Sequence, residues 1–289
     1  MTINSKVLTG IMVIIALALF NCALWRAELG SPGNPITMEY NQEAGTANKY
    51  KFTSNSSQDI DQAGQVFTMT VNAEGEVLHK IGKITGDKIT HELSYTSFSV
   101  QAQSDVSGTT SINADNVLNI PLLVVTGKSG EDVDLPNYKE LPVLSGEPMP
   151  AALGLMGMLP ELSKDPVTIM DKWTSSLQSI ELDLPPANAV LNINTEYTFE
   201  GIEKKMGYDC MKITGLAESK VELSFVAEGI DVDMIKTGNS EITAFFAFKE
   251  GFFVEISSQG KSESTLDAPA ANVTQKREEI SNTTFVLIK

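Results

Sequence analysis

Two scarcities in this 289-residue chain limit what it can do: it has only two cysteines and few positive charges. If Cys22 is modified, Cys210 has no partner, so no internal disulfide forms and stability has to come from burial of a hydrophobic core. Against 37 Asp and Glu stand 21 Lys and Arg, which gives a net charge of −16. This balance argues against nucleic acid as a partner and against electrostatic docking onto anionic lipid, so any membrane attachment must come from another feature.

Catalytic motifs are scarce as well. The chain has no Gly-x-Ser-x-Gly hydrolase motif. Its only histidines, His79 and His91, lack the spacing of metal ligands, and we expect them to be solvated or half-buried residues of strands. Cys210 has only Lys212 as a basic neighbour on the same strand face, which predicts an inert, partly buried thiol. The sequence therefore predicts a protein that is not an enzyme and that uses no cofactor and no metal.

The N-terminus carries an export signal. Lys6 precedes an apolar run over residues 7–20, and Cys22 follows directly after it. Leu19 and Cys22 occupy the outer positions of the four-residue box that ends bacterial lipoprotein signals, whereas Asn21 departs from that box. We predict lipid attachment at Cys22 after a signal over residues 1–22. Ordinary cleavage and an uncleaved anchor over residues 7–25 are the alternatives, and all three place the body outside the cytoplasm, in the bacterial cell envelope.

The segment over residues 23–46 is predicted to be a flexible tether. It contains Gly and Pro residues between 30 and 35 that break helix and strand alike. A spacer of this kind would hold an anchored domain away from the bilayer. The alternative is an ordered arm, because Ile36, Met38 and Tyr40 alternate with polar residues and are typical of an edge strand.

Two β-rich regions follow, at 47–135 and 191–289. Apolar residues recur at every second position, as in Val221, Leu223 and Phe225, which is typical of half-buried antiparallel strands. We expect turns at residues 74–75, 86–87, 228–229, 238–239 and 250–251, and a paired strand over 284–288. The fold class is mainly β, as one antiparallel curved sheet or half-barrel. A duplication into two similar β units is the alternative, because both regions open on a Tyr-x-Phe motif.

The connector over residues 136–190 is rich in proline, which excludes a central strand. Within it, Ala151 to Leu159 consists of helix-forming residues and glycines, with prolines at both ends. We predict one or two short helices in this connector.

A resemblance is carried by the run from Leu159-Pro160 through Pro166-Val167 to Asp171-Lys172-Trp173, and by the strands near Tyr197 and Cys210. This run resembles a group of uncharacterised bacterial envelope proteins, which are similar in turn to LolA-type periplasmic lipoprotein carriers. The resemblance implies a half-barrel with helices over its open side. Within the segment that carries it, we expect Trp173, Tyr197, Phe199 and Ile213 to be buried across a strand pair. This chain departs from that pattern in having little helix to form a lid.

Two apolar clusters are the remaining candidates for a site. Methionines gather in the connector, with Met156 and Met158 among them, and phenylalanines including Phe246 and Phe248 flank the turn at 250–251. Methionine adapts to irregular apolar partners, so we predict an apolar groove at these four residues, with a filled core as the alternative. The function predicted is a binding or carrier protein for an apolar ligand or a lipidated partner. A structural or protein-interaction lipoprotein without a ligand is the alternative.

Overall fold

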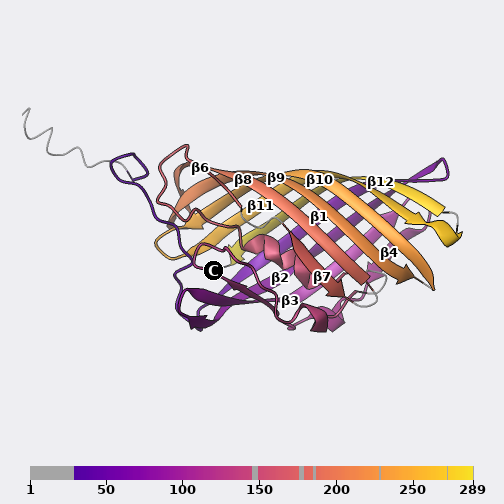
Figure 1. Ribbon diagram of the computed structural model, residues 1–289, viewed down its shortest axis with the longest axis horizontal. Helices are drawn as coiled ribbons and strands as arrows, with labels where there is room; N and C mark the ends of the chain where they lie inside the picture. The colour runs from indigo at the N-terminus through magenta and orange to yellow at the C-terminus, as the bar shows by residue number, and fades with distance from the viewer. Residues whose placement is uncertain are drawn as a thin grey trace, which may run out of the picture.

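The computed structural model describes residues 29–144, 149–175, 179–184, 187–227, 229–271 and 273–288 (Figure 1). The predicted signal and its lipid-attachment residue, Cys22, lie outside the described residues.

The described residues form twelve β-strands in a single antiparallel sheet. The strands are β1 (Ala47–Gln62), β2 (Gln65–Thr85), β3 (Lys88–Ser104), β4 (Gly108–Ile112), β5 (Leu122–Thr126), β6 (Lys172–Thr174), β7 (Ile180–Leu184), β8 (Ala187–Lys205), β9 (Tyr208–Ala227), β10 (Ile230–Ala247), β11 (Phe252–Ala268) and β12 (Val273–Ile288). Their order is β4-β3-β2-β1-β12-β11-β10-β9-β8-β6, with β5 beside β3 and β7 beside β8. The predicted mainly β, antiparallel, curved architecture is confirmed.

The two β-rich regions join in the middle of this sheet. The last strand, β12, pairs with β1 on one side and with β11 on the other. The predicted strand near the C-terminus is therefore correct, and it is central, although it ends the chain. The two Tyr-x-Phe motifs both lie in the core, with Tyr50, Phe52, Tyr197 and Phe199 buried.

Several strands are longer than the sequence predicts, because two glycines expected in turns lie inside strands. Gly75 lies within β2 and Gly238 within β10. A Cβ atom on Gly75 would be 2.1 Å from the carbonyl oxygen of Ser97, and one on Gly238 would be 2.7 Å from Cβ of Ser262. Both glycines allow a close approach of neighbouring strands, which is the other common reason for glycine in a strand. The turns predicted at these two places are wrong.

The connector contributes short helices and edge strands. The described helices are all of the 3-10 type: η1 (Asp115–Val117), η2 (Tyr138–Glu140), η3 (Ala151–Met158) and η4 (Pro269–Ala271). The helix η3 lies where the sequence predicts a helix, but with the tighter 3-10 winding. Two of its eight residues are glycines, which lower α-helix stability by about 1 kcal/mol each. None of the described helices has the length and apolar character needed to cross a membrane.

The segment before β1 is packed on the domain from Gly30 onward, where the buried Gly30 accepts a hydrogen bond from the Ile169 amide at 2.7 Å. Ile36, Met38 and Tyr40 are buried, and Ile36 forms an isolated antiparallel bridge with Val167. The Tyr40 hydroxyl donates to the carbonyl of Pro160 at 2.7 Å. The tether predicted over 23–46 is therefore wrong for residues 30–46, because burial of the alternating apolar side chains stabilises the packed segment.

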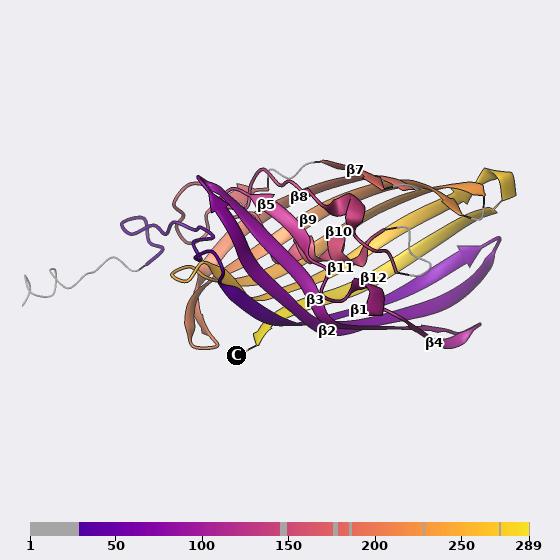
Figure 2. The same cartoon turned by 90° about the horizontal axis from the view of Figure 1, so that it is seen from below.

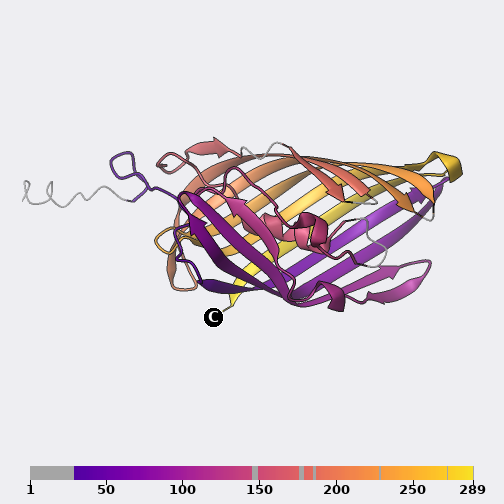
Figure 3. The same cartoon turned by 60° about the horizontal axis from the view of Figure 1, so that its bottom comes forward.

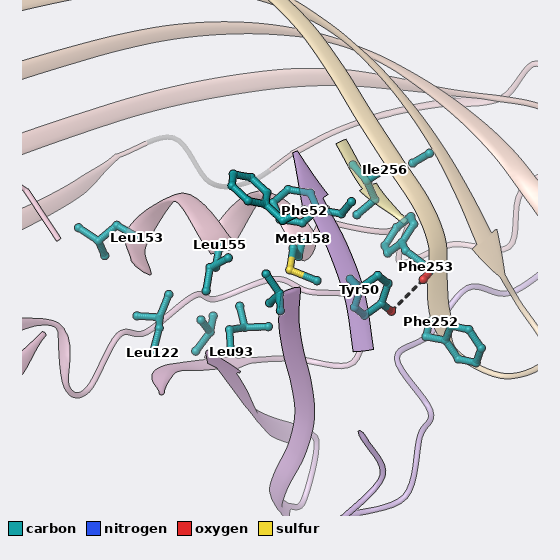
Figure 4. Packing of buried hydrophobic residues seen from close by; sticks show 14 of the residues in the cluster. Tyr50, Phe52, Leu93, Leu122, Leu153, Leu155, Met158, Phe252, Phe253 and Ile256 are labelled. Carbon is teal, nitrogen blue, oxygen red and sulfur yellow. Dashed lines mark hydrogen bonds between the residues drawn. The ribbon is translucent and has the colours of Figure 1, made fainter. Parts of the chain in front are cut away.

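The sheet curves around η3, as Figures 2 and 3 show. Successive side chains of a strand point to opposite faces, so the face that carries Tyr50 and Phe52 toward η3 is the inner face. Leu155 of η3 lies with Leu93 and Leu122 (Figure 4). The Tyr50 hydroxyl donates to the carbonyl of Phe253 at 2.8 Å and so fixes β1 to the start of β11.

Candidate functional site

The four residues of the predicted groove lie at the filled end of the sheet. Met158 and Phe246 are buried, with 4% and 0% of their surface exposed, and Met156 and Phe248 are half-buried at the border of the same cluster. Neither of the two hollows described below is lined by any of these residues. The structure brings the four into one packed cluster. Whether they accept a ligand stays a prediction.

The inner face changes character beyond this core. The register places Ser54, Thr283 and Ser258 in one row across β1, β12 and β11, and Ser56, Ser281 and Gly260 in the next row. These inward-facing residues are small and half-exposed. They separate the core from the part of the inner face that lies toward the opposite end of the long strands.

Apolar side chains return in that far part of the inner face, which we call the inner-face band. Its apolar members share two properties: they alternate with outward-facing neighbours, and they are half-buried, so part of each side chain stays exposed. They are Phe67, Met69 and Val71 on β2, Leu191 and Ile193 on β8, Val221 and Phe225 on β9, Met234 on β10 and Leu266 on β11. Because the sheet curves, residues from β2 and from β8–β11 border the band on opposite sides.

The middle of the inner-face band is charged. Lys236 on β10 and Glu279 on β12 form an ion pair at 2.5 Å, and Ser262 donates to the same carboxylate at 3.4 Å. Arg277 donates from Nε and Nη2 to the side-chain oxygen of Gln275, at 3.0 and 2.7 Å. The arrangement presents a guanidinium and an ion pair between two apolar borders.

The outer face of the sheet carries two shallow hollows. The larger, of about 1000 Å³, crosses six strands and is bordered by two cross-strand rows of outward-facing residues. One row contains Asp59, Glu278 and Glu263 directly opposite one another. The smaller hollow, of about 630 Å³, lies near Asp233 and Asp267. The larger hollow is lined mostly by polar and charged residues, whereas polar and apolar residues line the smaller hollow in equal number.

The two histidines are buried in contact with each other, at 4% and 0% exposed, which corrects the prediction of solvated or half-buried residues. His79 Nε2 lies 2.9 Å from His91 Nδ1, and His91 Nε2 lies 3.1 Å from the Thr126 hydroxyl. That hydroxyl donates to the carbonyl of Gly127 at 2.9 Å. Since a hydroxyl has one proton, His91 Nε2 donates to Thr126, and His91 Nδ1 accepts from His79. These hydrogen bonds need a neutral His91, because its Nδ1 accepts, and burial disfavours a charge on either imidazole.

Burial explains why they are neutral. It lowers the pKa of His79 to about 4, and burial together with the neighbouring His79 lowers the pKa of His91 to about 3. The diagonal contact results from the pairing of His79 with Leu93 and of Ile81 with His91. His79 alternates with Val77 on β2, and His91 alternates with Leu93 on β3, which is the sequence signal for their burial. The contact between the two histidines depends on the register of β2 and β3, which the sequence does not reveal.

The thiol of Cys210 is the other candidate reactive group, and its surroundings do not activate it. Burial raises the pKa of the Cys210 thiol to about 11, which opposes thiolate formation at neutral pH. Within the described residues, no three or more His, Cys, Asp or Glu side chains form a group able to hold a metal ion.

Trp173 stacks on Tyr197 at 5.5 Å between ring centroids and donates to the carbonyl of Glu161 at 2.9 Å, so it holds the connector against β8.

Comparisons with known proteins give weak likenesses. No protein-family model and no curated protein matches the chain. Lipovitellin, in a structure concerned with its lipid–protein interactions, is 11% identical at a TM-score of 0.45; the match covers 86% of this chain and 25% of lipovitellin, so this chain spans about a quarter of that length. Neisserial surface protein A is 7% identical at a TM-score of 0.22 and is covered over 99% of its length, against 84% of this chain.

A DUF1329 family protein from Desulfovibrio piger is 11% identical at a TM-score of 0.17; the match covers 79% of this chain and 83% of that protein. All three TM-scores are below 0.5, so no function follows from these likenesses. The resemblance to LolA-type carriers stays a prediction.

Proposed function

We propose that this protein is an exported, envelope-anchored, non-enzymatic binding or carrier protein that holds an apolar ligand, or the lipid of a lipidated partner, on its inner-face band. The observation that carries this proposal is the set of partly exposed apolar side chains on both borders of that band. Moving a fully exposed side chain of this kind out of water is worth about 1.5–3 kcal/mol. A ligand laid across several of the band residues would cover the part that each still exposes, and would gain the matching fraction of that free energy from each one without any change in the fold.

The outer face also exposes apolar residues, but these are isolated, whereas those of the inner face are grouped. This difference supports the inner face as the binding site. Ile235 and Ile280 are about half exposed, at 50% and 48%, but each stands between charged or polar neighbours on its own strand. Apolar residues scattered singly over a surface are normal, whereas contiguous patches mark binding sites. The apolar side chains of the inner-face band form one group on β2 and another across β8–β11, on either side of its charged middle, so the band favours a ligand with an extended apolar part.

Adjacent residues of β10 provide a matched test. Met234 faces inward between Leu223 and Leu266, and Ile235 faces outward. We expect Met234→Asp to reduce the binding of the uncharged fluorescent probe N-phenylnaphthylamine by about tenfold or more, because a carboxylate would have to lose water against the probe. Ile235→Asp should leave probe binding unchanged.

Denaturation midpoints of both variants would control for unfolding. Native mass spectrometry of the purified protein would show a copurified lipid. If the unmutated protein binds no probe and carries no lipid, the carrier function is wrong.

One observation favours the second candidate, a structural or protein-interaction lipoprotein. The end of the sheet around η3 is filled, and the larger hollow lies on the polar outer face, where a protein partner would fit better than an acyl chain. An outcome in which Ile280→Asp abolishes capture of an envelope protein, while no apolar probe binds, would support this function instead.

A further inference from the structure

Charge is distributed unequally between the two faces of the far half of the sheet. The outer positions carry the acidic residues, including Asp59, Glu218 and Glu278. The inner-face band carries three charged residues, Lys236, Arg277 and Glu279, whose sum is +1 (two cations minus one anion). In a chain with a net charge of −16, a positive inner face is the reverse of what the composition predicts.

Arg277 is responsible for this excess. Glu279 pairs with Lys236, so these two charges offset each other. The printed hydrogen bonds of Arg277 go to Gln275, a neutral side chain on its own strand, and no carboxylate of the described residues pairs with it. A half-buried guanidinium without an anionic partner retains a strong preference for one.

The chain uses arginine sparingly. Its sequence contains arginine at positions 26 and 277 alone, and lysine everywhere else that it needs a cation. Arginine differs from lysine in its planar fork of donors, which binds a carboxylate or a phosphate through two parallel hydrogen bonds. The single arginine of the described residues therefore stands at the position where this geometry faces the inner-face band.

The surroundings of Arg277 match an amphiphile. Across the sheet, its row reads Phe67 and Ile60 on one side, then Arg277, Ser264 and Lys236, and then Val221 on the other. Apolar side chains thus border the cationic centre on both sides, within the width of a few strands spaced about 4.8 Å apart.

We propose that the inner-face band binds an amphiphile with an acyl chain and an anionic headgroup, a carboxylate or a phosphate, and that Arg277 binds this headgroup. This inference rests on the proposed function, because it assigns the ligand class of the same surface. The acyl chain lies along the half-exposed apolar residues, and the headgroup takes the place of the missing counter-ion of Arg277. Ser264, opposite Arg277 on β11, is placed to donate a further hydrogen bond.

The first test compares amphiphiles that share one chain length. Dodecanoate, dodecanol and dodecyltrimethylammonium would each displace N-phenylnaphthylamine from the full-length protein at constant ionic strength. A charge-assisted hydrogen bond to the headgroup predicts that dodecanoate competes about tenfold better than the cationic amphiphile. Dodecyl phosphate should behave like dodecanoate. Inorganic phosphate alone should not displace the probe, which separates a lipid headgroup from a free anion.

The second test uses two neighbouring cations of β12. Arg277 faces inward, and Lys276 faces outward and is exposed. Arg277→Gln should remove the preference for dodecanoate and leave binding of the uncharged probe intact. Lys276→Gln makes the same change in net charge and should keep the preference. Arg277→Lys should retain part of it, because the charge stays while the fork is lost.

The outcomes separate this inference from the function on which it rests. If the probe binds and the three amphiphiles compete equally, the anionic ligand class is wrong while the apolar binding surface stands. The same holds if Arg277→Gln keeps the preference for dodecanoate. If the unmutated protein binds no probe and carries no copurified lipid, both the carrier function and this inference fail. The comparison of amphiphiles on the unmutated protein needs no variant to fold.

Discussion

At the scale of single residues, the fold accepts buried polar groups where their hydrogen bonds form a closed chain. His79 donates a hydrogen bond to His91, His91 donates one to Thr126, and Thr126 donates one to the carbonyl of Gly127. The ring of Tyr40 packs edge-on against His91, at 5.3 Å between centroids, so the segment before β1 covers the pair. A proton added to His91 Nδ1 would remove the acceptor of the His79 hydrogen bond, and a proton added to either imidazole would bury a charge.

Acid should therefore destabilise the protein through this pair. The folded pKa values of about 4 and about 3 lie below the ordinary value of 6.5, so between these values the unfolded chain binds more protons. The stabilisation is fully present above about pH 6.5 and is lost as the pH falls through the folded pKa values. We expect a loss of unfolding free energy of roughly 3 kcal/mol from each of the two imidazoles by about pH 4.

Urea denaturation across this pH range would measure the loss. The variant His79→Gln/His91→Gln lacks both titrating groups and should have a flatter pH profile. An unchanged slope between neutral pH and about pH 4 would show that other groups cause the dependence.

At the scale of elements, the sequence predicts the position of the helix η3 and the half-buried, antiparallel nature of the strands. Prolines and apolar residues located η3, and period-two alternation located the strands. Two turns predicted from glycines are wrong, because Gly75 in β2 and Gly238 in β10 lie where neighbouring strands approach too closely for a side chain. The inner-face band could not be predicted, because it depends on which strands pair. Phe67, Ile193 and Arg277 share one surface only through the order β2-β1-β12-β11-β10-β9-β8.

Substitutions at two adjacent residues of η3 should measure separately how side-chain packing and backbone freedom contribute to stability. Leu155 is fully buried, so Leu155→Ala should cost about 3 kcal/mol through lost contacts and a cavity. Gly154 is exposed and has open space where a Cβ atom would stand. Gly154→Ala should therefore stabilise by about 0.5 kcal/mol, because it restricts the unfolded chain. Thermal and urea midpoints would measure both changes. Equal midpoints for Leu155→Ala and the unmutated protein would mean that η3 does not seal the core.

At the scale of the whole molecule, the two faces of the sheet carry different chemistry, and this division bears on how the protein reaches a membrane. The outer face collects the acidic residues that give the chain its net charge of −16. A surface of that kind is repelled by anionic lipid headgroups. The body therefore has no electrostatic means of attachment, and the predicted envelope location depends on residues before those that the structure describes.

Attachment through Cys22 is the prediction that follows. One acyl chain gives only marginal, reversible membrane binding, whereas two or more chains hold a protein firmly, so Cys22 would hold an acidic body at the membrane if it carries at least two acyl chains. Intact-mass analysis of protein extracted from membranes should show a chain that begins at Cys22 and carries added acyl mass. Cys22→Ala should release the protein or leave it unprocessed, with the denaturation midpoint of the body unchanged. A mature chain that retains residues 1–21 would instead establish the uncleaved anchor, and one that begins near Cys22 without acyl mass would establish ordinary cleavage.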